Sequence, residues 1–263
     1  MPSRRPEFLG RRGSADTCME TARRGSPGDA SVPFLRFSAR PRLWLFDLDD
    51  TLIASSRGLL DEVHDLMNEF LMHRMGMTEA EANHWRSWYW EHYGSTFIGL
   101  WRCHGVDPRV FLPAVHDFDY TPYLNGLHSP RRLLEKFPGK RAVVTNGPRV
   151  YAEKLLTALG LDGFFDAVVT STDMRLFGDW RPKPSVSMLR AICADLGSRP
   201  GDAVLIDDSL MNLRAAKRAG MRTVWCTGLR RRHAGLRTRT GAPMPTLAAD
   251  MIVRDITELL RRI

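Results

Sequence analysis

The segment Trp-Leu-Phe-Asp-Leu-Asp-Asp-Thr-Leu-Ile, residues 44–53, decides the fold of this chain. It predicts a hydrophobic strand that ends in two carboxylates one residue apart, Asp47 and Asp49. Strand alternation puts both on the same side of the backbone, at the carboxyl end of the strand, where open α/β sheets place their ligand sites. Two acids held together there bind a cation, share a proton, or do both.

Length and composition favour a globular enzyme. The 263 residues are 43% hydrophobic, which is enough for one large domain or for a core with a smaller inserted domain. No apolar run approaches the ~18 residues of a membrane span, and no secretory signal is evident. The four cysteines are scattered, which indicates reduced thiols and neither disulfides nor a zinc site. We therefore expect a soluble cytoplasmic enzyme with no membrane contact.

The net charge of +8 comes from the two ends of the chain. Arginines concentrate in residues 1–42 and 229–263, whereas the region between them is slightly acidic. The charge therefore says little about an active site. We expect solvated ends and no nucleic-acid partner; the alternative is that these arginines touch RNA or an anionic surface.

The order of patterns along the chain predicts three regions. Residues 1–40 combine Arg, Ser, Gly and Pro, which predicts a disordered Arg-rich leader and makes Met19 a second candidate for the start. Residues 57–125 read as an all-helical insertion, with a capping box at Thr78 and Glu81 that begins a helix through about Tyr93, and further helices near 96–104 and 108–117. Residues 41–56 and 126–263 would form the core.

In the core, short apolar runs alternate with helical patterns. We expect strands at 141–145, 167–170, 203–206 and 223–226, the last being the final core strand, and helices at 150–159, 185–196 and 210–219. Alternation of this kind predicts βαβ units and a parallel sheet. The fold class is therefore α/β, a doubly wound parallel sheet with an inserted helical cap.

Polar residues follow three more of the expected strands or lie between them. Thr145 and Asn146 can point a hydroxyl and N–H groups at an anion, although Thr-Asn-Gly is also an ordinary turn. Lys183 lies between two prolines that restrict its backbone, although a solvated surface lysine has the same pattern. Asp207 and Asp208 are adjacent acids at a strand end, which suits a metal because unpaired carboxylates repel each other.

The order of the aspartate pair, Thr-Asn, Lys and the second acid pair resembles the haloacid dehalogenase-like hydrolase superfamily, over roughly residues 42–228. The resemblance implies a Rossmann-like core and a phosphatase. Asp47 would be the nucleophile that forms an aspartyl phosphate, and Asp49 the general acid and base. Thr145, the Asn146 N–H and Lys183 would hold the phosphoryl group of a small phosphomonoester.

The same resemblance implies Mg²⁺ as the cofactor. Its ligands would be the carboxylates of Asp47 and Asp208 and the backbone carbonyl of Asp49, with Asp207 assisting directly or through water. Elementary chemistry agrees, because a phosphate dianion repels a carboxylate unless cations reduce the charge. Dehalogenases of the superfamily lack the second acid, so Asp49 favours phosphoryl transfer over carbon–halogen cleavage.

Three segments, 93–100, 115–120 and 212–216, look like the pyrimidine 5′-nucleotidase branch, whose members act on nucleoside monophosphates such as UMP and CMP. Asp50 and Ile53 depart from that branch, which usually has Asn and Tyr there. The expected function is therefore a nucleoside 5′-monophosphate phosphatase. The alternatives are a sugar-phosphate or other small-metabolite phosphatase, a phosphomutase, and a non-catalytic RNA-binding or regulatory protein. The oligomeric state stays open.

Aromatic residues gather in the expected cap, between residues 85 and 101. Their helical spacing indicates that most of them pack the cap, and substrate contact by at least one is the alternative.

Overall fold

The structure is a computed structural model that describes residues 41–124, 129–229 and 247–263. The expected disordered leader, residues 1–40, lies outside the described residues, as does the Arg-rich segment 230–246.

A six-stranded sheet forms the centre of the core, with the strand order β3-β2-β1-β6-β7-β8 and every neighbouring pair parallel. The strands are β1 (Leu43–Phe46), β2 (Lys140–Val144), β3 (Ala167–Val169), β6 (Ala203–Asp207), β7 (Arg222–Cys226) and β8 (Met251–Val253). The chain builds outward from β1 through β2 to β3, then crosses to β6 on the other side of β1. The strand order therefore reverses between β1 and β6, where α/β sheets open a crevice for ligands.

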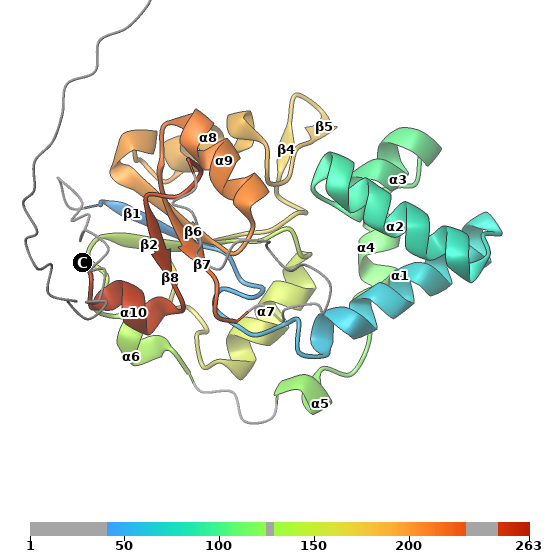
Figure 1. Cartoon of the computed structure of the whole chain (residues 1–263), viewed down its shortest axis with the longest axis horizontal. Coiled ribbons are helices and arrows are strands. Elements are labelled where there is room, and N and C mark those ends of the chain that lie inside the picture. The colour runs from blue at the N-terminus through green and yellow to red at the C-terminus, as the bar shows by residue number, and fades with distance from the viewer. Residues whose placement is uncertain (1–40, 125–128, 230–246) are drawn as a thin grey trace, which may run out of the picture. The chain divides into compact units, whose positions relative to one another are not determined.

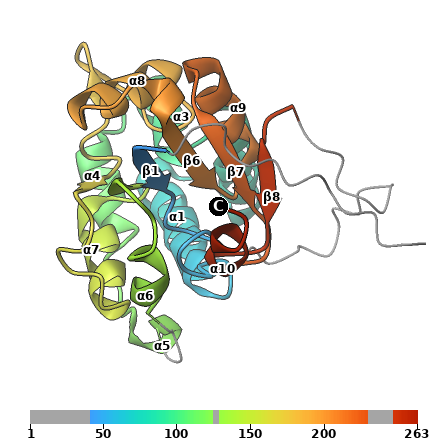
Figure 2. The same ribbon diagram turned by 90° about the vertical axis from the view of Figure 1, so that its left-hand side faces the viewer.

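Helices cover both faces of this sheet (Figures 1 and 2). Side chains of β1 alternate between two hydrophobic clusters, with Trp44 and Phe46 in one and Leu43 and Leu45 in the other. The first cluster includes residues of α6 (Arg131–Leu134), α7 (Arg149–Ala158) and α10 (Ile256–Leu260). The second includes residues of α8 (Val186–Asp195) and α9 (Leu210–Ala219). Because both faces of β1 are buried, its sequence is a continuous apolar run, as a central parallel strand requires.

The predicted doubly wound α/β fold is confirmed, with two corrections. The strand at 223–226 is not the last, because β8 pairs with β7 and extends the sheet at that edge. A short antiparallel hairpin, β4 (Arg175–Leu176) and β5 (Asp179–Trp180), was not predicted either. Its turn residues Phe177 and Gly178 have φ values of 53° and 82°, as in a type I′ turn, which rarely places a bulky residue there.

Five helices lie within residues 57–124, where the structure describes no strand. They are α1 (Leu59–Met75), α2 (Glu79–Tyr93), α3 (Thr96–His104), α4 (Pro108–Ala114) and α5 (Thr121–Leu124). We call α1–α4 the inserted helices. The predicted capping box begins α2: Glu81 N–H donates to Thr78 Oγ1 at 3.3 Å, and Thr78 N–H donates to Glu81 Oε2 at 2.8 Å. The fourth helix ends at Ala114, a few residues before the predicted end.

The inserted helices have a hydrophobic cluster of their own, which includes Leu71, Tyr89, Leu100 and Phe111. Trp180 of the β4–β5 hairpin joins this cluster. Three described cysteines, Cys103, Cys193 and Cys226, are free, in agreement with the sequence. Among the residues that the structure describes, no helix is both long and apolar enough to cross a membrane.

Candidate active site

Two acidic strand ends meet where the strand order reverses. Asp47 directly follows β1, and Asp207 is the last residue of the neighbouring strand β6. The backbone N–H of Asp47 donates to the carbonyl of Ile206 at 2.9 Å, which continues the parallel ladder by one residue. Because the two strands run in parallel and in register, their carboxyl ends bring these acids together.

The loop after β1 turns sharply at Asp50, which has a positive φ of 55°. Its N–H donates to the carbonyl of Ile53 at 2.6 Å, and its Oδ1 accepts from the N–H of Ser56 at 2.9 Å. Asp and Asn are the residues, other than Gly, that best tolerate this left-handed conformation. Asp50 therefore builds this turn, and it closes the loop that carries Asp49.

Lys183 joins the two acidic strand ends. Its Nζ donates to Asp47 Oδ1 at 2.7 Å and to Asp207 Oδ2 at 2.8 Å, and the residue is only 2% exposed. Asn146 fixes the lysine backbone: its Nδ2 donates to Lys183 O at 2.9 Å, and its Oδ1 accepts from Lys183 N–H at 3.0 Å. The surface-lysine alternative is therefore wrong, and the side chain of Asn146 has a bracing role that the sequence did not indicate.

Further donors hold Asp207 rigidly. Its Oδ1 accepts from the N–H of Ser209 at 2.8 Å, and Asn212 Nδ2 lies 3.0 and 3.1 Å from its two carboxylate oxygens. The neighbouring Asp208 is anchored through its backbone, because its carbonyl accepts from Trp225 Nε1 at 2.9 Å. Asp207 is fully buried and Asp208 is partly exposed, so the two adjacent acids face different surroundings.

Burial and charge shift the titration of this cluster. Burial raises the pKa of Asp47 well above its ordinary value, against the opposing charge of Lys183. Burial alone lowers the pKa of Lys183, but Asp207 and Asp47 outweigh it and raise that pKa above its ordinary value. The lysine is therefore charged at neutral pH. One ammonium group faces the three carboxylates of Asp47, Asp207 and Asp208, so the cluster has an excess of negative charge when all of them are ionised.

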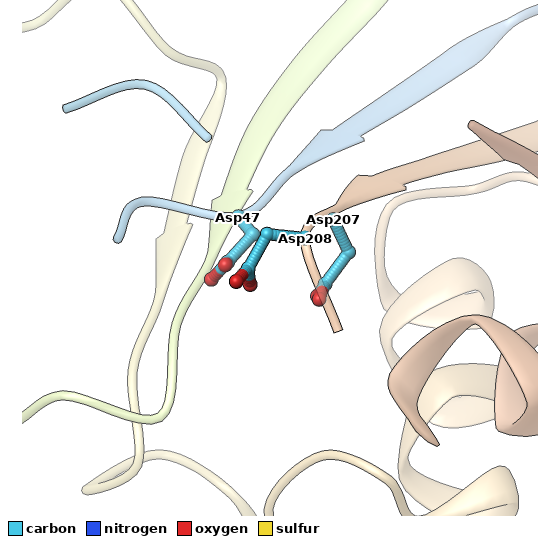
Figure 3. Close-up of side chains that lie close together, drawn as sticks. All are labelled: Asp47, Asp207 and Asp208. Atoms are coloured by element: carbon cyan, nitrogen blue, oxygen red, sulfur yellow. The ribbon is translucent and has the colours of Figure 1, made fainter. Parts of the chain in front are cut away.

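The three carboxylates fit a divalent cation. Asp47, Asp207 and Asp208 each offer an oxygen, and these oxygens lie within 4.8 Å of one another. Figure 3 shows the three carboxylates pointing to the same side of the strand ends. Oxygen donors of this kind suit Mg²⁺, which accepts one or two carboxylates and keeps several waters. The side chain of Asp49 is not part of this group.

Thr145 also lies at the carboxyl-terminal end of the parallel strands, directly after β2, and is fully buried. Its N–H donates to the carbonyl of Val169 at 3.0 Å, and its hydroxyl accepts from the N–H of Gly147 at 3.0 Å. These bonds shape a tight turn that leads into α7. The hydroxyl is thus placed by local structure, as the turn interpretation of Thr-Asn-Gly also predicts.

Sequence reasoning missed Tyr151, whose hydroxyl donates to Asp49 Oδ1. Tyr151 lies on α7, is 1% exposed, and packs edge-on against His116 with 5.0 Å between ring centroids. Burial raises the pKa of Asp49, while hydrogen bonding opposes that rise. In the sequence, Tyr151 is one of several apolar positions at helical spacing, so no signal distinguishes it from a core residue.

The aromatic side chains of the inserted helices pack mainly on one another. Trp88 stacks on His92 with 3.8 Å between centroids, and Trp85 stacks on Tyr89 with 5.6 Å. Tyr89 is 1% exposed, and Phe97 contacts Trp180 of the hairpin edge-on at 6.4 Å. This agrees with the packing interpretation for most of these rings.

Residues 44–226 match the haloacid dehalogenase-like hydrolase family. Among curated proteins, the chain is 27% identical over 219 residues to validoxylamine A 7′-phosphate phosphatase of Streptomyces hygroscopicus subsp. limoneus, covering 82% of this chain and 94% of that protein. It is 24% identical over 261 residues to N-acylneuraminate-9-phosphatase of Mus musculus, covering 86% and 96%.

Among solved structures, CbbY from Rhodobacter sphaeroides in complex with phosphate has the same fold. It superposes with a TM-score of 0.55 at 22% identity, covering 83% of this chain and 96% of that one.

Proposed function

The chain belongs to the haloacid dehalogenase-like hydrolase family and is a phosphatase, and from this premise we propose that it hydrolyses small phosphomonoesters through an aspartyl phosphate on Asp47. The observation that carries the proposal is the bridge from Lys183 to Asp47 and Asp207, buried where the strand order reverses. A buried ammonium between two carboxylates places positive charge next to a nucleophile that must approach an anionic phosphoryl group.

In the first step, a carboxylate oxygen of Asp47 attacks phosphorus. A P–O bond forms to Asp47 while the bond from phosphorus to the leaving oxygen breaks. Asp49, in its acid form, gives its proton to that oxygen, so an alcohol departs. Lys183 stabilises the added negative charge, and Thr145 with the N–H of Asn146 would hold the phosphoryl oxygens.

In the second step, water attacks the phosphorus of the aspartyl phosphate. Asp49, now a carboxylate, takes a proton from the water, and the P–O bond to Asp47 breaks. Inorganic phosphate leaves, and both aspartates return to their starting forms. Splitting the hydrolysis in this way replaces one difficult displacement with two easier ones.

We assign Mg²⁺ to the carboxylates of Asp47 and Asp208 and the backbone carbonyl of Asp49, with Asp207 acting directly or through water. When bound, the ion would supply positive charge against the phosphoryl oxygens. Because Asp207 already accepts from Lys183, Ser209 and Asn212, its main role in this proposal is to orient the lysine.

We propose that residues 57–125 act as a cap over a core of residues 41–56 and 126–263, and that the cap selects the substrate. Two substrate classes are supported. The named relatives are a validoxylamine A 7′-phosphate phosphatase and an N-acylneuraminate-9-phosphatase, which favours sugar phosphates or other small-metabolite phosphomonoesters. The resemblance of segments 93–100, 115–120 and 212–216 favours pyrimidine nucleoside 5′-monophosphates. A cytoplasmic location is part of the same proposal.

A substrate panel tests this function. Purified protein with Mg²⁺ is assayed for phosphate release from UMP, CMP, sugar phosphates and sugar-acid phosphates, with and without EDTA. We expect release from at least one class, its loss with EDTA, and its loss in Asp47→Asn with the fold retained. Undiminished turnover in Asp47→Asn would refute the nucleophile, and transfer of phosphate between positions without net release would indicate a phosphomutase.

A further inference from the structure

A buried tyrosine contacts the proposed general acid. Tyr151 comes from α7 and donates its hydroxyl hydrogen to Asp49 Oδ1, across 102 residues of sequence. Tyr151 is not among the residues of the four motifs that the sequence analysis singled out. Phenol hydroxyls in protein interiors usually find a partner, so the contact alone is also what a packed tyrosine would make.

The surroundings fix the ring of Tyr151 on several sides. Gly147 leaves the space for it, because a Cβ there would lie 2.7 Å from Tyr151 Cδ1. The His116 ring packs edge-on against it, and the Tyr120 ring lies 5.8 Å away between centroids. Burial lowers the pKa of His116 to about 4, so this neighbour is neutral at ordinary pH. Tyr151 therefore has one defined position from which to reach Asp49.

The hydrogen bond distinguishes the two oxygens of Asp49. The phenol can donate to Oδ1 both when the carboxyl carries its proton and when it has lost it. Because the hydroxyl occupies Oδ1, the proton to be transferred is left to Oδ2. The side chain is then oriented in the same way in both steps of the reaction.

The segment that carries Tyr151 also carries the proposed phosphoryl ligands. Thr145 and Asn146 form the turn after β2, and Tyr151 follows in the first turns of α7. The turn is held by the Gly147 N–H bond to Thr145 Oγ1 and by the Asn146 bonds to the backbone of Lys183. A single rigid segment thus places groups for the phosphoryl oxygens and the partner of the acid.

We propose that Tyr151 is a positioning residue that holds Asp49 by Oδ1 so that Oδ2 faces the leaving oxygen. This inference rests on the proposed function, in which Asp49 protonates the leaving group. It predicts an effect that depends on the leaving group, whereas a purely structural tyrosine would affect all substrates equally. Alkoxides need a proton to depart, but 2,4-dinitrophenolate leaves without one.

The test compares Tyr151→Phe with wild type over a series of phosphate monoesters, from alkyl phosphates through p-nitrophenyl phosphate to 2,4-dinitrophenyl phosphate, with Mg²⁺ present. We expect kcat/KM to fall by about ten- to a hundredfold for alkyl phosphates, as for the loss of a hydrogen bond to a charged group. For 2,4-dinitrophenyl phosphate, the expected change in kcat/KM is less than about threefold. Urea unfolding checks that the near-isosteric variant is folded.

Tyr120→Phe is the matched control. Tyr120 is also buried in this aromatic group, but its hydroxyl donates to the backbone carbonyl of His116. We expect a change in kcat/KM that does not vary along the series. Asp49→Asn supplies the reference for complete loss of the acid, and its dependence on the leaving group should be steeper than that of Tyr151→Phe.

The outcomes separate the positioning role of Tyr151 from the general-acid role of Asp49. A uniform fall along the series in Tyr151→Phe, or no fall, overturns the positioning role, while a steep dependence in Asp49→Asn still supports the acid. A flat series in Asp49→Asn itself overturns the acid assignment and the inference with it. Equal slopes for Tyr151→Phe and Tyr120→Phe assign both tyrosines to packing.

Discussion

The edge of the sheet and the inserted helices both contain many polar and aromatic side chains, but they use them differently. At the sheet edge, side chains that are far apart in sequence meet one another, as in the contacts of Lys183 with Asp47 and Asp207. In the inserted helices, several aromatic side chains meet close neighbours of the same helix, as Trp88 does with His92, and others pack between helices, as Phe70 does with Phe111. The first region therefore brings reactive groups together, whereas much of the second is devoted to its own packing.

The difference follows from topology. Parallel strands that are neighbours in a sheet must bring their carboxyl ends to one edge, so residues at those ends converge whatever the connections between them. A helical insertion has no such constraint, because its helices need only bury an apolar stripe. The groups proposed for the reaction thus lie at or near strand ends, while the proposed selection of the substrate would depend on the packing of the inserted helices.

The largest expected effect comes from breaking the ionic bridge at the sheet edge. Lys183→Met leaves two buried carboxylates without their cation, which should lower the free energy of unfolding by about 3–5 kcal/mol. Activity should fall by about 10²–10³-fold or more. Urea unfolding and phosphate release measure the two effects.

Lys217→Met is the control for that variant. Lys217 pairs with Asp250, and the side chains of both are about one third exposed (34% and 31%). Loss of such a partly solvated pair should cost about 0–1 kcal/mol and leave activity intact. An equal loss of free energy of unfolding in Lys183→Met and Lys217→Met would contradict the conclusion that the buried ion pairs of Lys183 stabilise the fold more than a partly exposed pair does.

A smaller effect on the free energy of unfolding is expected from His116, which follows the last of the inserted helices. Burial lowers the pKa of His116 from 6.5 to about 4, so the unfolded chain binds the proton more readily. The contribution of neutral His116 to the free energy of unfolding is complete above 6.5, the pKa of this side chain in the unfolded protein. It is lost as pH falls from 6.5 towards 4. This group alone should make wild type about 2 kcal/mol less stable at pH 5 than at pH 7.

Urea unfolding of wild type and His116→Asn at both pH values measures that contribution. The asparagine can still donate to the Leu112 carbonyl that His116 Nδ1 contacts, but it does not titrate. The variant should therefore lose part of the pH dependence, whereas His84→Asn, at an exposed position, should keep it. An unchanged slope in His116→Asn would show that this histidine is not buried as a neutral group.

The smallest expected change in activity concerns Gly94, at the end of α2, where the inserted helices contact the segment that carries Lys183. A Cβ at Gly94 would lie 2.4 Å from Pro184 Cδ, next to Lys183, whereas Gly105 has nothing within 4 Å. Both glycines end helices with positive φ, so backbone strain from alanine should cost about 1–2 kcal/mol of stability at either position. The clash with Pro184 adds to that cost at Gly94 alone. Only Gly94→Ala should also lower kcat/KM, by about tenfold, because it pushes on the segment that carries Lys183.

Steady-state kinetics of both alanine variants test this contact between the regions. If Gly94→Ala and Gly105→Ala have the same activity, the end of α2 does not bear on the site.

The sequence predicted the central strands of the sheet and the acids that follow two of them, because a strand ending in a charged residue is a local pattern whose partners are set by strand order. Lys183 lies in a loop, so only the family resemblance indicated its place beside those acids. It was not sufficient for Tyr151, because a tyrosine at an apolar helical position has the same pattern whether or not its hydroxyl meets Asp49. Other misses have physical causes too. The strands β4 and β5 have only two residues each, and their turn places Phe177 at an unfavourable positive φ.

The nucleotide specificity inferred from the cap segments is still a proposal. Segment 93–100 belongs to the end of α2 and to α3, where packing explains the pattern of aromatics equally well. Segment 115–120 follows α4, and segment 212–216 lies on α9 of the core. The chemistry does not depend on it, because the proposed groups for attack and proton transfer lie in the core.

Trapping the phosphorylated enzyme would show whether Asp47 is the nucleophile. Asp49→Asn is mixed with Mg²⁺ and 2,4-dinitrophenyl phosphate, whose leaving group needs no proton, quenched in acid within the first turnover, and sequenced by tandem mass spectrometry. Because the variant lacks the base for the second step, we expect a phosphoryl group on Asp47. A phosphoryl group on any other residue, or turnover without a covalent adduct at any time, would contradict it.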